Sequence, residues 1–426
     1  MILIFSQQHS PRLQYACSFI FKEMMGVEFS VATSKEAFDG FDGIKIDYSN
    51  SASNGSFGLP DCGLLFEKDI HLQNIICSQQ PGYKVFFAGT GKDFSFDIFS
   101  AIFYLLSRYE EYLPHTKDMY GRYAHENSLA FKENFLSLPL INIWVNDFIK
   151  AIKEKVPLFS INYSAFTFLP TYDIDIAYAY QHKGIFRNAG GFLKSPAAER
   201  IKVLAGLQKD PFDTYAWLDA LHGQYSFQPI YFFLLAQKNG LYDKNILPHK
   251  NSLQQLIKKH ADKYATGIHP SWQSGDNFLL MKQEKKLLEN IVAKPVTQSR
   301  QHYIRFNLPH GYRRLAEAGI TDDYSMGYGS INGFRASVAS SFYWYDLEAE
   351  KQSTLRVHPF CFMDANAFYE QQFTAAQAYD ELMHYYNVCK NVNGTLSSIW
   401  HNNFFGTDKS FAGWKEIYQN FMALVQ

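Results

Sequence analysis

Residues 165–175 read AFTFLPTYDID, an apolar run that ends in two aspartates separated by one residue. The run at residues 166–169 is typical of a strand buried on both faces, as in a parallel sheet. Pro170 opposes that interpretation, because proline removes one hydrogen bond from a central strand. Side chains alternate along an extended chain, so Asp173 and Asp175 are expected to point the same way. Two carboxylates so near each other favour a bound cation or a shared proton. The structural alternative is an Asx turn at the end of the strand.

The length and charge of the chain limit the classes of protein to consider. A length of 426 residues predicts two domains, because it exceeds what one small core needs. A formal net charge of −1 gives no electrostatic footprint for nucleic acid or an anionic membrane. Five scattered cysteines indicate a reducing compartment. With neither a signal-peptide pattern nor an apolar run of about 18 residues, we expect a cytoplasmic protein without a membrane span.

Residues 1–160 are predicted to form a smaller α/β domain of unknown role. A strand is expected at residues 1–5, and residues 12–25 have the apolar spacing of a helix. Residues 96–112, FDIFSAIFYLLSRYEEY, are apolar on most faces and predict one helix packed inside this domain. The polar loop at residues 118–125 is interpreted as structural, with the alternative that it reaches over a neighbouring site.

Residues 161–426 show a repeated pattern of strand followed by helix. Strands are predicted at seven places: residues 165–173, 229–235, 266–269, 297–306, 319–323, 355–362 and 395–400. Helices are predicted between most of them: residues 213–225, 252–263, 277–292, 311–318 and 374–391. Seven such units predict an α/β barrel of parallel strands ringed by helices, slightly smaller than the usual eight-fold barrel.

Polar side chains gather where the predicted strands end, which is the edge where such barrels keep their chemistry. In chain order these are Asp173, Asp175, His269, Arg300, His302, Asp322, Asp323, Asp364, Trp400 and His401. One carboxylate and two imidazoles suit a zinc ion and leave positions open for water and substrate. A second Asp then serves as a general base, a separate His as a general acid, and an Arg holds the base ionised. Taken singly, each histidine is more often a structural group.

The order of these motifs resembles that of the polysaccharide deacetylases, the NodB-homology carbohydrate esterases of family four. The resemblance covers residues 165–405 and rests on TYDID, a strand-end His, an R-x-x-Y element and a last-strand hydrophobic-x-His. It implies a distorted seven-stranded (β/α) barrel at residues 161–426. DPFDTY and DDYSMGYGSINGFR are also similar to a bacterial subgroup of this family with an added N-terminal domain.

The resemblance also implies roles for individual residues. In the family the first Asp of the opening motif is the base and the next carboxylate binds the metal, which implies Asp173 as base and Asp175 as ligand. The strand-end His269 is implied as a second ligand. Arg300 then orients the base, and His401 is the general acid.

One ligand of the family pattern is missing, because Gln273 stands where the second metal-binding imidazole is expected. We predict that His302, at the end of the neighbouring strand, supplies the lost ligand. Ser271 or Gln273 acting through water is one alternative, and loss of the metal is another. Zinc is the expected metal, with cobalt or manganese as alternatives.

The predicted substrate contacts are aromatic or polar residues at or after the strand ends: Tyr303, Trp272, Arg335, Asp323 and Trp400. Aromatic residues make up 17% of the chain, which fits stacking on sugars or simply an aromatic-rich core. The sequence therefore predicts metal-dependent hydrolysis of N- or O-acetyl groups from a polysaccharide or glycan. The alternatives are an inactive barrel that binds glycan and a DxD glycosyltransferase, although no glycine-rich strand–turn–helix of a nucleotide fold is apparent.

Overall fold

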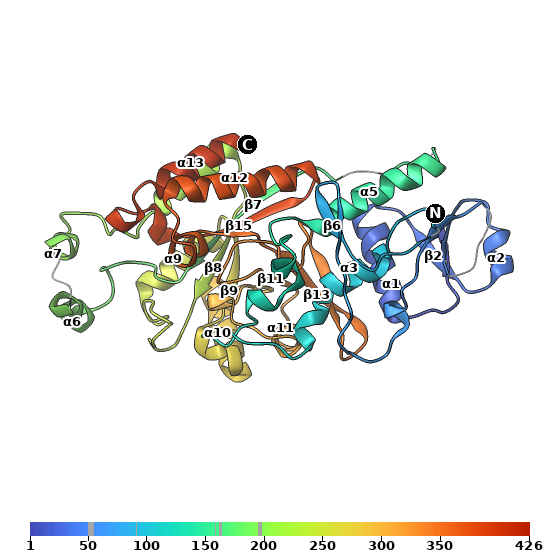
Figure 1. Cartoon of the computed structure of the whole chain (residues 1–426). Helices are drawn as coiled ribbons and strands as arrows, with labels where there is room; N and C mark the ends of the chain where they lie inside the picture. Colours follow the sequence, from blue (N-terminus) through green and yellow to red (C-terminus); the bar gives the residue numbers. More distant parts are fainter. Residues whose placement is uncertain (50–54, 91, 158, 162–163, 195–197) are drawn as a thin grey trace.

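The computed structural model describes residues 1–49, 55–90, 92–157, 159–161, 164–194 and 198–426 (Figure 1). We define residues 1–157 as the N-terminal segment. Its first part, coloured blue, lies at one end of the molecule, and the larger sheet fills the centre. The domain boundary predicted near residue 160 lies beside residues 158 and 162–163, which are outside the described residues, and the division stays a prediction. In the described part of the chain, no helix is both long and apolar enough to cross a bilayer.

Four short parallel strands begin the N-terminal segment and form one sheet in the order β2-β1-β3-β4: β1 Ile2–Phe5, β2 Phe29–Ala32, β3 Ile44–Tyr48 and β4 Phe57–Leu59. All of β1 is buried, as its ILIF sequence requires. A separate hairpin pairs β5 Ser78–Gln80 with β6 Tyr83–Val85. The described residues of the segment also form five α-helices, α1 Pro11–Cys17, α2 Lys35–Asp39, α3 Ile98–Leu106, α4 Leu129–Lys132 and α5 Leu140–Lys155, and a π-helix at Ser18–Met24 directly follows α1.

The single helix predicted at residues 96–112 is wrong in its C-terminal half. The helix α3 ends at Leu106, and residues Tyr109–Tyr112 form a separate 3-10 turn. Between them Arg108 adopts a left-handed backbone conformation, with φ of 54°. Its buried guanidinium binds Glu110 and Glu111, so the chain turns around this side chain instead of continuing the helix.

The central sheet contains nine strands instead of the predicted seven, in the order β12-β13-β11-β10-β9-β8-β7-β15-β14. The strands are β7 Thr167–Ile174, β8 Ile230–Leu234, β9 Ala265–His269, β10 Gln298–Ser299, β11 Asp322–Met326, β12 Phe342–Asp346, β13 Lys351–Pro359, β14 Phe362–Met363 and β15 Thr395–His401. Only β12 pairs antiparallel. Each predicted strand overlaps one of these strands, and the whole is a mixed α/β fold whose sheet curls into a half-barrel.

Pro170 is accommodated inside β7 because the two neighbours of this strand pair over different lengths. Strand β15 runs alongside from Thr167 to Asp173 and places Ser398 opposite Pro170. Pairing with β8 begins only at Thr171. Pro170 therefore has no residue of β8 in register with it.

Six helices of the described residues pack around the central sheet (Figure 1): α8 Tyr215–Tyr225, α9 Asn251–Ala261, α10 Phe278–Val292, α11 His310–Glu317, α12 Ala375–Asn391 and α13 Trp414–Leu424. Two more, α6 Ile185–Lys194 and α7 Ala198–Leu204, precede them in the chain. Each of the five predicted helices overlaps one of the six. The longest, α12, begins at a capping box in which Thr374 and Gln377 satisfy each other's backbone N–H groups. In Figure 1, α6 and α7 stand away from the body of the fold at the end opposite the N-terminal segment.

The strand predicted at residues 297–306 is much shorter in the structure. Only Gln298–Ser299 form β10, and residues His302–Ile304 form a 3-10 turn. Tyr303 and Ile304 have φ of 59° and 54°, values that an L-residue does not adopt within a strand. The early turn directs the side chain of His302 toward the end of β9.

Buried ion pairs fasten the N-terminal segment to the central fold. Arg335 donates two hydrogen bonds to Glu111, at 2.8 and 2.5 Å, and Arg108 donates one to the same carboxylate at 2.8 Å. Burial alone would raise the pKa of Glu111, but Arg335 and Arg108 lower it to about 2. This carboxylate is therefore ionised inside the protein, where its charge depends on both guanidinium groups.

We expect Arg335→Met to destabilise the protein by about 3–5 kcal/mol, because it leaves the buried charge of Glu111 with only one partner. A control is Lys22→Met, which removes a lysine that is 47% exposed and pairs with Glu28, which is 74% exposed. That change should cost about 1 kcal/mol or less. Urea unfolding followed by tryptophan fluorescence measures both, and equal effects would contradict a special role for the buried pair.

Candidate metal centre

The pairing of the parallel strands determines which side chains meet at their C-terminal edge. His401, the last residue of β15, lies opposite Asp173 of β7. His269, the last residue of β9, lies opposite Leu234 at the end of β8. Asp175 follows one residue after the end of β7. Residues far apart in the sequence therefore surround one point at the edge of the sheet.

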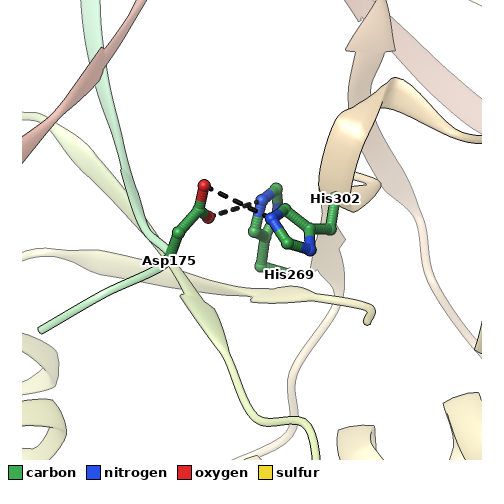
Figure 2. A group of neighbouring side chains, drawn as sticks. All are labelled: Asp175, His269 and His302. Atoms are coloured by element: carbon green, nitrogen blue, oxygen red, sulfur yellow. Dashed lines mark ion pairs between the residues drawn. The ribbon is translucent and has the colours of Figure 1, made fainter. Parts of the chain in front are cut away.

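Asp175, His269 and His302 form a candidate metal centre, with one potential ligand atom from each within 4.8 Å of the others (Figure 2). His269 Nε2 is 3.1 Å from Asp175 Oδ1, and His302 Nε2 is 3.3 Å from Asp175 Oδ2. Both imidazoles are buried, and the carboxylate is partly exposed. This is the ligand set that the sequence predicts, and the structure brings its three members together.

The hydrogen bonds behind the two imidazoles fit a divalent cation. His269 Nδ1–H donates to the carbonyl oxygen of Arg300 at 2.5 Å, and His302 Nδ1–H donates to Asp243 Oδ1 at 2.9 Å. Each ring therefore turns its Nε2 toward Asp175, as in metal-binding histidines that are held by a carbonyl or carboxylate. Asp175 Oδ1 is buried and has no hydrogen-bond partner among the described residues. The three side chains could therefore hold a divalent cation.

The electrostatics of the centre favour positive charge. Burial alone would lower the pKa of His302, but Asp175 and Asp243 raise it to about 9. Burial would raise the pKa of Asp175, but His302 and the other two imidazoles hold it well below its usual value. Two carboxylates on either side of one imidazole therefore attract either a proton or a cation to this point.

Asp173, the predicted base, lies beside the candidate ligands. Its Oδ1 accepts a hydrogen bond from Arg300 Nη1 at 2.8 Å, and its Oδ2 is 3.7 Å from His269 Nε2. Arg300 is completely buried, and its Nε donates to the carbonyl oxygen of Tyr324 at 3.0 Å. Because the guanidinium is held from two sides, it fixes the Asp173 carboxylate in place.

His401, the predicted acid, has a carboxylate behind it. Its Nδ1–H donates to Asp364 Oδ1 at 2.6 Å, and its backbone N–H donates to the other oxygen at 2.7 Å. Burial alone would lower the pKa of His401, but Asp364 and Asp175 raise it well above its usual value. The imidazole is therefore held as an imidazolium, with Nε2 3.5 Å from Asp175 Oδ2.

These groups line a cavity of about 480 Å³, a volume within the range of small-molecule sites. Its walls include Asp173, Asp175, His269, His302 and His401. Of the predicted substrate contacts, Tyr303 also lines it. Tyr120, Arg122 and Tyr242 contribute to the same wall as Tyr303.

The other four predicted substrate contacts lie outside the cavity lining. Trp272 packs against Tyr242 with ring centroids 4.6 Å apart, and Trp400 packs in the core against Tyr418. Arg335 is bound to Glu111, as described above. Asp323 is buried, and its carboxylate accepts hydrogen bonds from the backbone N–H and hydroxyl of Ser325.

The alternative ligands considered from the sequence are engaged elsewhere. Gln273 Nε2 donates to Asp243 Oδ2 at 3.0 Å, so this side chain supports the carboxylate behind His302. Ser271 donates from its hydroxyl and its backbone N–H to the two oxygens of Glu284, at 2.6 and 2.9 Å. Neither residue lines the cavity.

Sequence reasoning missed Asp243 and assigned no role to Asp364. Asp243 lies in the loop after β8, and Asp364 directly follows β14. An acidic residue shortly after a predicted strand was the available signal for both. Their pairing with His302 and His401 depends on how the loops fold.

Comparisons with known proteins match parts of the chain. The sequence model of a family of unknown function, DUF7033, matches residues 2–157. No curated protein matches the chain in sequence. Among solved structures, a Mycobacterium smegmatis protein assigned as a polysaccharide deacetylase has a TM-score of 0.41 and 12% identity, over 62% of this chain and 84% of that one.

Two further solved structures are similar to the same extent. A polysaccharide deacetylase from Bacillus cereus has a TM-score of 0.32 and 11% identity, over 61% of this chain and 88% of that one. A branching enzyme from Thermococcus kodakaraensis, solved in complex with glucose, has a TM-score of 0.37 and 10% identity, over 62% of this chain and 68% of that one. An activity does not follow from likenesses of this size, and the chemistry rests on the side chains of the cavity.

The choice between His302 and Gln273 as third ligand can be tested by metal affinity. We expect His302→Ala to weaken zinc or cobalt binding by at least about tenfold, because it removes a ligand atom, whereas Gln273→Ala should have a much smaller effect. Isothermal titration calorimetry of both variants and the unchanged chain measures the difference. Equal weakening by the two substitutions would contradict the assignment of His302.

Glu284 gives the fold a predictable pH dependence. It is buried in α10, and burial raises its pKa from 4.5 to about 7 despite the hydrogen bonds from Ser271. Between these pH values the folded protein binds a proton that the unfolded chain has lost, so stability falls as the pH rises. Relative to Glu284→Gln, the free energy of unfolding of the unchanged chain should fall by up to about 3 kcal/mol between about pH 5 and pH 8. Urea unfolding at both values measures this, and a pH-independent difference between the two proteins would refute it.

Proposed function

We propose that this chain is a metal-dependent hydrolase that removes N- or O-linked acetyl groups from a polysaccharide or glycan. The observation that carries the proposal is the meeting of Asp175, His269 and His302 at one point. A carboxylate held by an arginine and an imidazolium held by a carboxylate lie beside that point. The resemblance of the motif order to that of polysaccharide deacetylases supports the substrate class.

The three ligands suit zinc, with cobalt or manganese as alternatives. A divalent cation bound by them would supply a Lewis acid for the acetyl carbonyl and lower the pKa of water. Asp243 keeps the ring of His302 in the orientation of a ligand, and the carbonyl of Arg300 does the same for His269. The chain thus holds both imidazoles in place before any substrate arrives.

Proton transfer is divided between two residues. Asp173 takes a proton from the water that attacks the acetyl carbon, and the hydrogen bond from Arg300 holds this carboxylate in place. His401 donates its Nε2 proton to the departing amine or alkoxide as the acetyl bond breaks. Asp364 stabilises the imidazolium form that this step requires. The products are acetate and the free amine or hydroxyl of the sugar.

The direct test is acetate release from chitooligosaccharides and acetylated xylan, with and without added Zn²⁺ or Co²⁺. We expect release that depends on the metal and that falls about 10²–10⁴-fold in Asp173→Asn, since the general base is lost. The same variant should keep its metal affinity, because Asp173 is not among the three proposed ligands. Titration calorimetry with the metal alone provides that control.

Failure of the metal-loaded protein to release acetate from a broad panel of acetylated glycans would refute the proposed hydrolase. Glycan binding without release, unaffected by chelators, would instead favour a barrel that binds sugars without catalysis. Loss of metal binding in Asp173→Asn would contradict the division of roles between Asp173 and the ligand set.

A further inference from the structure

The N-terminal segment forms part of the wall of the candidate active site. Residues 117–123 make a turn that is closed by a backbone bridge between Lys117 and Tyr123. Tyr120 and Arg122, at the tip of this turn, line the same cavity as the candidate metal ligands. The residues of this turn belong to the part of the chain that matches DUF7033. A region outside the deacetylase-like motifs therefore reaches the site.

Specific polar contacts hold the turn against the central fold. Arg122 Nη1 donates to the carbonyl oxygen of Tyr303 at 2.8 Å, and its Nε donates to Asp118 at 2.5 Å. Arg305 Nε donates to the carbonyl oxygen of Tyr120 at 3.2 Å. The turn is thus bonded to the loop that carries His302, and its position relative to the candidate metal centre is defined.

A close approach at Gly329 adds a steric constraint. A Cβ atom at this position would overlap the Arg122 guanidinium and would lie 2.9 Å from the carbonyl oxygen of Tyr303. Arg122 itself is buried, with its guanidinium 4.7 Å from the centroid of the Tyr120 ring. The missing side chain at Gly329 therefore makes room for the arginine that positions Tyr120.

Three tyrosines from distant parts of the chain meet beside the metal centre, and we call Tyr120, Tyr242 and Tyr303 the tyrosine cluster. The ring centroid of Tyr120 lies 5.2 Å from that of Tyr303 and 5.7 Å from that of Tyr242. The centroids of Tyr303 and Tyr242 are 5.4 Å apart. The Tyr303 ring is 4.7 Å from the ring of His302. The cluster therefore begins next to a proposed ligand and extends away from it.

The exposure of the cluster distinguishes it from core aromatics. All three rings are partly exposed and line the cavity. Buried tyrosines usually place their hydroxyl on a protein partner. Among the described residues, none forms a hydrogen bond with the three phenol hydroxyls of the cluster. Flat apolar faces with free hydroxyls, next to a polar reaction site, suit a sugar ring, which offers both C–H groups and hydroxyls.

We propose that the tyrosine cluster is a binding subsite for the sugar next to the one that carries the reacting acetyl group. The inference rests on the proposed function, and it names the substrate class as an oligosaccharide of at least two sugars. Tyr120 supplies the outer wall of the subsite, so the N-terminal segment determines how strongly the glycan beyond the acetylated sugar is held. Arg122 acts as a positioning residue through its contacts with Tyr120 and Tyr303.

The test compares Tyr120→Ala and Tyr120→Phe in the full chain. Calorimetry with chitotetraose and with N-acetylglucosamine, and with an acetylated xylotetraose and acetylated xylose, gives dissociation constants without requiring turnover. For at least one pair, the unchanged chain should bind the tetrasaccharide more tightly than the monosaccharide. Tyr120→Ala should weaken tetrasaccharide binding by about tenfold and leave monosaccharide binding unchanged, whereas Tyr120→Phe, which keeps the ring, should lose little.

Two controls separate binding from folding. Tyr225→Ala removes a partly exposed tyrosine at the end of α8, next to the edge where the strands begin, and should not change any of these affinities. Zinc affinity should also be unchanged in Tyr120→Ala if the turn keeps its position. A displaced turn would disturb His302 through Tyr303 and would therefore weaken zinc binding. A loss of zinc affinity together with weakened monosaccharide binding would show a structural role only and overturn the subsite.

The outcomes also distinguish this inference from the proposed function. If the chain releases acetate from the tetrasaccharides and Tyr120→Ala does not change this release, the subsite is overturned and the proposed hydrolase stands. Tetrasaccharide binding that depends on Tyr120 without any acetate release would keep the subsite and refute the hydrolase. If the unchanged chain binds neither tetrasaccharide, the subsite is overturned.

Discussion

The site depends on one constraint, the parallel pairing of β7 with β8 on one side and β15 on the other. Parallel strands end at the same edge of a sheet, so each contributes its last residues to one small region. The register then places His401 opposite Asp173 and brings His269 to the same edge. A shift of one residue in β7 would turn Asp173 to the opposite face, because side chains alternate along a strand.

Charge balance is the second requirement of this edge. Four carboxylates gather there, and each is matched by a cationic or imidazole group. Asp173 has Arg300, and Asp364 has His401. Asp175 and Asp243 lie on opposite sides of His302, which leaves this part of the site with more negative than positive charge unless a proton or cation is present. The arrangement explains why the same geometry that fits a metal also raises the pKa of an imidazole.

The N-terminal segment is part of this arrangement and not only an attached unit. Its turn at residues 117–123 forms a wall of the cavity, and its buried carboxylate Glu111 pairs with Arg335 of the central fold. Breaking that pair would leave an unpaired charge inside the protein. Separating the two parts therefore costs considerable free energy.

The sequence alone was sufficient for the local elements and for part of the site. The spacing of apolar residues follows the repeat of a half-buried strand or helix. The strands and helices around the central sheet could therefore be predicted from it. His302 could be proposed beside Asp175 and His269 because parallel strands share one edge. Only the tertiary structure decided the long-range contacts: the break of the predicted helix at Arg108, the burial of Arg335 against Glu111, the support of His302 by Asp243, and the approach of Tyr120 to the cavity. These residues lie in loops and turns, which leave no periodic signal, and some of the contacts join side chains far apart in the chain, such as Glu111 and Arg335.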